Sequence, residues 1–247
     1  MSIERLQWFY DQFYWPNNAT VTVVGAIQKH DILAYVQKYF GVHDKAPHEF
    51  PPVYTEEPLQ EGERRATVVR TSTSNMVAVG YKIPSGLHED APYIDLMNAV
   101  LSDGITSRLY TSFVDTKLAT DATAFNFILK DPSLTMAFLT LAPHVRHAEA
   151  EKKLKHEYVR LAESGPTKAE LARIKKRFEA THRARRDGPF AFLSVLNEYI
   201  GLGDWTQFET YMDKVHTATT KDIQRVAKKY AVESQGTVCW FVGKNPS

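Results

Sequence analysis

The chain has 247 residues, of which 43% are hydrophobic and 12% aromatic, enough for a sizeable core in one large or two small domains. Its formal charge of +1 at neutral pH argues against a protein that binds nucleic acid through its overall charge. The single cysteine, Cys239, excludes an internal disulfide, and no apolar run reaches the ~18 residues of a membrane helix.

The first part of the chain predicts a helix, a strand and a second helix. Ser2 can cap a helix whose apolar residues recur at helical spacing as far as residue 13. Residues 19–25 predict a strand, and residues 31–40 predict the second helix. Three such elements cannot bury all of their apolar surface among themselves. We therefore expect them to dock on another part of the structure.

Residues 42–64 predict a linker. This stretch holds four prolines and six acidic residues but few aliphatic ones. Prolines make such a segment extended and fairly stiff. The alternative, a long surface loop within one domain, is less consistent with the length of the stretch.

Residues 65–247 predict one α+β unit. The predicted strands cover residues 66–70, 76–83, 117–129, 134–141 and 237–243. The predicted helices cover residues 93–101, 146–163, 167–186, 190–200 and 206–215, with two more starting at 106 or 107 and at 219. Because strands and helices occur in groups, helices should cover one face of a mixed, largely antiparallel sheet.

Three local details accompany this prediction. Asp90 is placed to cap the helix at residues 93–101. The helix at residues 190–200 is apolar on most sides, so we expect it to be buried. Cys239 lies in an apolar run, which favours a buried thiol over a nucleophile.

Several short motifs follow one another in an informative order. They are Tyr14-x-Pro16-Asn17-Asn18-Ala19-Thr20-Val21, Lys38-Tyr39-Phe40-Gly41, Asp95 with Ala99-Val100-Leu101, Ser107-Arg108-Leu109-Tyr110, Phe113-Val114-Asp115 with Leu118-Ala119, Pro166-Thr167 with Glu170-Leu171, and Thr219 with Asp222-Ile223. In this order they resemble the non-catalytic C-terminal repeat of the pitrilysin/insulinase-type zinc metallopeptidases. Residues 1–41 then resemble the closing helix–strand–helix of a preceding, catalytic-type repeat.

The resemblance implies a role for the chain. It would be the non-catalytic half of a zinc metalloendopeptidase and form one wall of a chamber that encloses peptides. The catalytic repeat would lie upstream in the same polypeptide or on a partner subunit, so the chain is expected to be a fragment or a separate subunit. Zinc is expected in that catalytic half and no cofactor in this chain. A periplasmic and a cytoplasmic location both stay open, and no membrane partner is expected.

The chemistry of this family needs the inverted zinc motif H-x-x-E-H on a helix, where two His bind the metal and the Glu activates water. None of the nine histidines has that context. The nearest cluster is His144-x-x-His147-x-Glu149, which we interpret as solvated surface residues. We therefore predict that this chain has no catalytic residue, binds no metal and cleaves no peptide alone.

Many relatives supply an Arg and a Tyr that reach the substrate from this repeat. In this sequence Val114 stands in place of that Arg and Thr120 in place of that Tyr, so the pair is absent. Arg108 and Tyr110 do not inherit its function. We expect these four residues only to lie in the wall of the substrate chamber. Arg108 should pair with another group at a helix start, and Tyr110 should pack against neighbouring side chains.

Two other functions remain open. The chain could be a structural, assembly or peptide-binding module without a peptidase role. It could also be a basic nucleic-acid-binding module, because residues 146–187 hold 13 Lys/Arg against 7 Asp/Glu, a net charge of +6. We interpret the run from Arg173 to Arg186 as a solvated helix face and expect no nucleic-acid partner.

Overall fold

The computed structural model describes residues 2–51 and 58–244. Pro52, Glu56 and Glu57 of the predicted linker lie outside these residues. The elements in chain order are α1 (Ile3–Phe13), η1 (Pro16–Asn18), α2 (Lys29–Tyr39), β1 (Arg64–Thr71), β2 (Asn75–Ile83), α3 (Ala91–Ser102), η2 (Tyr110–Val114), β3 (Ala119–Asn126), β4 (Ser133–Leu141), α4 (His147–Ser164), α5 (Lys168–Ala184), α6 (Pro189–Leu202), α7 (Gln207–Thr217), α8 (Thr220–Tyr230), η3 (Glu233–Gln235) and β5 (Gly236–Lys244).

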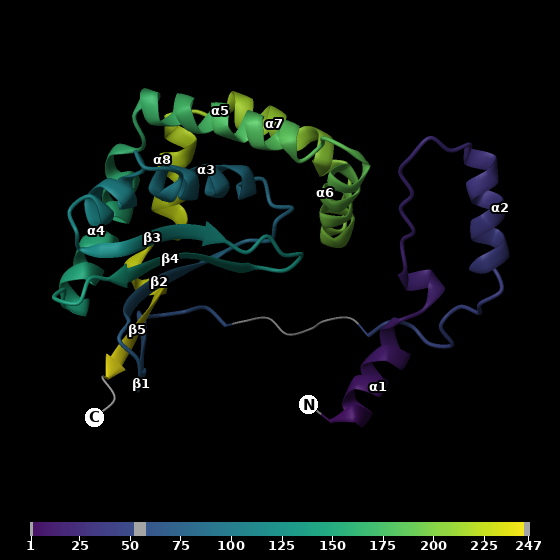
Figure 1. Cartoon of the computed structure of the whole chain (residues 1–247), viewed down its shortest axis with the longest axis horizontal. Helices are drawn as coiled ribbons and strands as arrows, with labels where there is room; N and C mark the ends of the chain where they lie inside the picture. The colour runs from purple at the N-terminus through teal and green to yellow at the C-terminus, as the bar shows by residue number, and fades with distance from the viewer. Residues whose placement is uncertain (1, 52–57, 245–247) are drawn as a thin grey trace.

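The strands form one mixed sheet in the order β1-β5-β2-β4-β3. Three neighbouring pairs are antiparallel, and only β1 and β5 run parallel. The hairpin of β3 and β4 is antiparallel, as the short connection predicts. Figure 1 shows α3, α5, α7 and α8 stacked on one side of this sheet. The predicted α+β class with helices on one face is therefore confirmed.

The core lies between the sheet and α3. This helix buries its apolar residues on nearly every side, with Leu96, Met97 and Val100 inaccessible to solvent. Helix α8 follows α7 and begins with a capping box formed by Thr219 and Asp222. Its apolar stripe faces the same core. Helix α3 is thus enclosed by the sheet on one side and by other helices on the other.

Asp90 does not cap α3 as predicted. It has a helical backbone conformation and no side-chain capping bond. Its carboxylate is fully buried and instead forms an ion pair with Arg225 at 2.6 Å and accepts hydrogen bonds from Lys229 at 2.9 Å and Tyr230 at 2.6 Å, all from α8. The sequence-based prediction was wrong because these partners lie far along the chain.

Residues 2–51 lie apart from the sheet and its helices in Figure 1. Neither α1 nor α2 has a buried residue. The predicted strand at residues 19–25 is not formed, because a strand needs a hydrogen-bonded neighbour and the described chain provides none there. A 2.7 Å hydrogen bond from Thr22 Oγ1 to Asn197 Oδ1 of α6 links this part to the rest of the chain.

Two other expectations about burial need correction. Phe190 at the start of α6 is 82% exposed, and only Val195 and Leu202 of this helix are buried. The reason is position: α6 lies at the margin of the helical layer, beside the first 51 residues in Figure 1. Cys239 on β5 is half-buried and unpaired, not fully buried.

Candidate functional site

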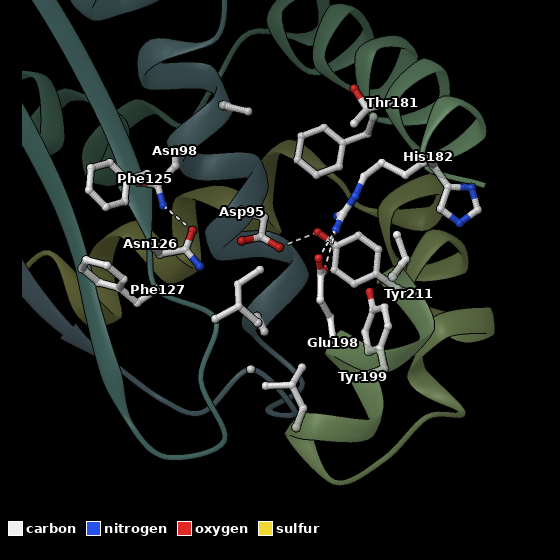
Figure 2. A pocket seen from close by; sticks show the side chains of 18 of the residues that line it. Asp95, Asn98, Phe125, Asn126, Phe127, Thr181, His182, Glu198, Tyr199 and Tyr211 are labelled. Carbon is white, nitrogen blue, oxygen red and sulfur yellow. Dashed lines mark hydrogen bonds and ion pairs between the residues drawn. The ribbon is translucent and has the colours of Figure 1, made fainter. Parts of the chain in front are cut away.

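A cavity of about 970 Å³ opens where α3 and the end of β3 meet the layer formed by α5, α6 and α7. Figure 2 shows Asp95 of α3 pointing across this cavity toward Tyr211 of α7. Asn98 and Asn126 lie on one side of Asp95, while Tyr199, Glu198 and His182 lie on the other. The cavity thus combines polar side chains from a core helix with aromatic and charged side chains from the outer helices.

Helix α3 supplies the polar wall. Asp95, Asn98 and Ser102 recur at intervals of three and four residues, so they lie along one face of this otherwise apolar helix. Asn98 donates to Asn126 Oδ1 at 2.8 Å and accepts from Thr135 Oγ1 at 2.9 Å. Ser102 donates to the carbonyl oxygen of Ala124 at 2.9 Å. These bonds tie the polar face of α3 to β3 and β4.

Asp95 is the one charged residue of this polar face, and its hydrogen-bond donors are neutral groups. Its Oδ2 accepts a hydrogen bond from the Tyr211 hydroxyl at 2.5 Å, and the Asn126 amide is its other hydrogen-bond partner. Burial raises the pKa of Asp95 to about 6, because two neutral donors offset only part of the lost hydration. No Lys, Arg or His among residues 2–51 and 58–244 forms an ion pair with it.

Asp90 provides an internal comparison at the start of the same helix, where it is fully buried while Asp95 is half-buried. Arg225 forms an ion pair with the Asp90 carboxylate, and Lys229 and Tyr230 donate hydrogen bonds to it. These groups hold the pKa of Asp90 well below its usual value despite burial. Asp90 is therefore a structural carboxylate paired with cations. Asp95 faces a cavity instead, and no cation of the described residues pairs with it.

The basic residues on the other wall are engaged elsewhere. Arg177 pairs with Asp103 at 2.6 Å, and Arg185 pairs with Glu198 at 2.5 Å. The Arg186 guanidinium lies 3.8 Å from the centre of the Phe208 ring and donates to the Phe208 carbonyl oxygen. These contacts account for much of the basic run that suggested a nucleic-acid-binding face.

The four residues expected in a chamber wall are not among those that line this cavity. Arg108 forms a two-pronged ion pair with Glu170 and donates to the Gly165 carbonyl oxygen, so it joins the start of η2 to the start of α5. Tyr110 is half-buried in η2, and Val114 packs against the core. Thr120 is exposed on β3.

His147, from the cluster of His144, His147 and Glu149, is held by contacts with β5. The His147 ring lies 5.5 Å from the Trp240 ring, and its Nε2 is 2.9 Å from the Phe241 carbonyl oxygen. In the part of the chain that the structure describes, no three His, Cys, Asp or Glu side chains gather into a group that could hold a metal ion. Nor does any described helix have the length and apolar character needed to cross a membrane.

Asp95 is not among the site residues predicted from the sequence. A signal for it was present, because three polar residues at helical spacing interrupt a helix whose other faces are apolar. The remaining wall comes from α6 and α7, whose approach to α3 depends on tertiary packing.

Comparisons with known proteins agree with the fold. The family model described as "Peptidase M16 inactive domain" matches residues 1–178. The zinc protease PqqE of Helicobacter pylori is 27% identical over 246 residues, which cover 97% of this chain and 55% of that protein.

Two solved structures show how far the likeness extends. The crystal structure of a protease from Helicobacter pylori aligns with a TM-score of 0.93 at 25% identity and covers 98% of this chain and 59% of that one. A peptidase M16 inactive domain from Pseudomonas fluorescens shares the fold, with a TM-score of 0.82 at 15% identity over 100% of this chain and 60% of that one. The chain thus spans a little over half the length of these relatives. Because the family model covers more than half of the chain, the chain belongs to the peptidase M16 inactive-domain family.

Proposed function

We propose that this chain is the non-catalytic half of a zinc-dependent metalloendopeptidase and forms one wall of a chamber that encloses peptides. The observation that carries the proposal is the match to the M16 inactive domain together with the coverage of the relatives. The Helicobacter pylori zinc protease has about 45% of its length without a counterpart in this chain. A catalytic repeat of that size would work with this chain in cis or as a partner subunit.

The first 51 residues support a docking role. Their helices and extended segments leave many large side chains exposed by half or more of their surface. These are Leu6, Trp8, Tyr10, Tyr14, Leu33, Tyr35, Tyr39 and Phe40. Large exposed apolar side chains in this number are typical of an interface. We assign it to the catalytic repeat, whose strands would also pair with the extended residues 19–25.

Zinc belongs to the other half in this proposal. The described residues do not fit the ion, since Asp95 is surrounded by hydroxyl and amide groups and not by further carboxylates or imidazoles. The contribution of this chain would be to hold substrate and exclude alternatives. Misplacement of a substrate by ~1 Å can lower a rate by on the order of 100-fold, so a wall without catalytic groups still affects turnover.

The proposal is tested by association. The chain is mixed with a separately expressed catalytic repeat that carries the H-x-x-E-H motif, and the complex is measured by sedimentation velocity. We expect one-to-one association that weakens when Trp8 and Tyr35 are both changed to Ser. Replacement of Val159, an exposed residue of α4, by Ser is the control and should leave association unchanged. Absence of any complex, with both partners folded, would favour the structural or peptide-binding module.

A further inference from the structure

We propose that the cavity around Asp95 binds an organic cation, an ammonium or guanidinium group carried on an aliphatic stem. The peptide source of this cation rests on the proposed function, whereas binding of the cation itself does not. The site would then hold a basic side chain or the amino terminus of a peptide against the non-catalytic wall.

The first argument is charge. At neutral pH the Asp95 carboxylate is largely ionised, since the pKa of this group is about 6. Among the described residues its hydrogen-bond donors are two neutral groups, the Tyr211 hydroxyl and the Asn126 amide. A half-buried carboxylate without a cation still loses hydration that neutral donors do not fully replace. A cation from solution would form a charge-assisted hydrogen bond there and recover this loss.

The second argument is the shape and chemistry of the walls. Tyr199 and Tyr211 lie with ring centres 6.5 Å apart beside Asp95. Burial and, to a smaller extent, the Asp95 charge raise the pKa of Tyr199 to about 12. Aromatic faces next to a carboxylate favour an organic cation. The cavity is also lined by Ile128, Leu129 and Leu202, which suit an aliphatic stem.

The third argument is the state of the other charged groups. Those that line the cavity are Asp103, Lys130, Arg177, His182, Arg185, Arg186 and Glu198. Arg177 and Arg185 are neutralised by Asp103 and Glu198, and Arg186 is held on Phe208. Burial and the neighbouring Arg186 lower the pKa of His182, so that ring is neutral at neutral pH. Lys130 is an exposed lining residue whose charge disfavours a polycation, which leaves a single compact cation as the ligand.

The test is isothermal titration calorimetry of the folded chain at neutral pH. The probes are butylguanidinium and butylammonium, with butylurea as the uncharged shape control and butanoate as the anion control. We expect both cations to bind at least about ten-fold more tightly than butylurea, the range of a hydrogen bond to a charged group. Binding should weaken by about the same factor near pH 5, where Asp95 is protonated but the probes stay charged.

Variants identify the group responsible. Asp95→Asn, shown to be folded by circular dichroism, should lose the preference for cations over butylurea. Tyr199→Leu is a second variant that removes the aromatic wall and should weaken the cations without affecting butylurea. The matched control is Glu89→Gln, which removes one exposed carboxylate next to α3 and should bind like the native chain. Equal cation binding by native chain and Asp95→Asn, or no cation binding by the native chain, would overturn the proposal.

Three tripeptides separate the sources of the cation. Acetyl-Ala-Arg-Ala-amide and acetyl-Ala-Lys-Ala-amide carry only a side-chain cation, and Ala-Ala-Ala-amide carries only an amino terminus. If a tripeptide of either kind binds and Asp95→Asn abolishes the binding, the ligand is a peptide. The tripeptide that binds shows whether a basic side chain or the amino terminus enters the cavity. Binding of the small probes without any tripeptide would leave a cation site but refute its peptide source. Because no peptidase activity is measured, failure here is distinct from failure of the proposed function.

Discussion

The hydroxyl of Tyr211 lies 2.5 Å from Oδ2 of Asp95, and this hydrogen bond joins α7 to α3 across the edge of the cavity. It fixes the carboxylate in the direction of the cavity. It also leaves Tyr211 difficult to ionise, because burial and the Asp95 charge both raise the pKa of its hydroxyl well above the ordinary value. The pair therefore remains a hydroxyl donating to a carboxylate throughout the neutral range.

Replacement of Asp95 by Asn should stabilise the chain at alkaline pH. The folded pKa of about 6 lies above the ordinary 3.8, so the folded chain binds more protons between these values and its stability falls as the pH rises through this window. Above about pH 6 the ionised Asp95 carboxylate lowers the free energy of unfolding by its full amount, and the uncharged Asn side chain removes this destabilisation. We expect a gain of about 1–3 kcal/mol at pH 8 and little change near pH 4, measured by urea unfolding. Equal stability of both proteins at pH 8 would contradict this pKa.

Replacement of Asp90 by Asn should have the opposite sign. Its carboxylate is fully buried and bound by Arg225, Lys229 and Tyr230, which keep its pKa low. Its contribution is present above the ordinary pKa of 3.8 and is lost as the pH falls through the lower folded value. We expect a loss of about 2 kcal/mol at neutral pH, since hydrogen bonds to a charged group are removed. Glu89→Gln, at an exposed neighbouring position, should change unfolding by less than about 0.5 kcal/mol.

Arg108 should act through stability and not through turnover. It pairs with Glu170 at 2.8 Å and is 10% exposed, and this pairing holds the pKa of Glu170 at about 2. Arg108→Ala should lower the free energy of unfolding by about 1–3 kcal/mol, because Glu170 and the Gly165 carbonyl lose their donor. Lys168→Ala, at an exposed residue of the same helix start, is the control. An effect of Arg108→Ala on peptide cleavage at unchanged stability would assign this side chain to the chamber wall.

Val114 and Thr120 should matter little for catalysis. Val114 packs against the core, and the Thr120 hydroxyl donates to the Thr140 carbonyl at 3.3 Å. Neither side chain carries a group that stabilises a transition state. With Val114→Ala or Thr120→Ala, kcat/KM of the reconstituted peptidase should stay within about three-fold of the native value. Only Val114→Ala should lower the free energy of unfolding, because it removes packed methyl groups. A large fall in kcat with unchanged unfolding would give these positions a direct role.

Local patterns were enough to predict most of the elements in residues 65–247. The β3–β4 hairpin, the capping box at Thr167 and the helix that begins after Thr219 form as the local sequence predicts, since each depends on residues close in sequence. The parallel pairing of β1 with β5 could not be predicted in this way, because its register joins residues more than 170 positions apart, such as Arg64 and Thr237.

In the candidate site, too, local features could be predicted from the sequence and features set by tertiary packing could not. The polar spacing on α3 was visible in the sequence, but the difference between Asp90 and Asp95 was not. It depends on α8 delivering two cations to Asp90 while α7 delivers only a hydroxyl to Asp95. The expected strand at residues 19–25 failed for a related reason, since its partner is absent from the described chain.

The most direct test of the account is cleavage of a fluorogenic peptide by three samples: this chain, the zinc-bearing catalytic polypeptide, and both together. We predict no chelator-sensitive cleavage by this chain alone, because it presents no metal motif and no evident nucleophile with a base. The mixture should cleave at least about ten-fold faster than the catalytic polypeptide alone, and chelator should abolish the activity. Chelator-sensitive cleavage by this chain alone, or full activity of the catalytic polypeptide without it, would contradict the account.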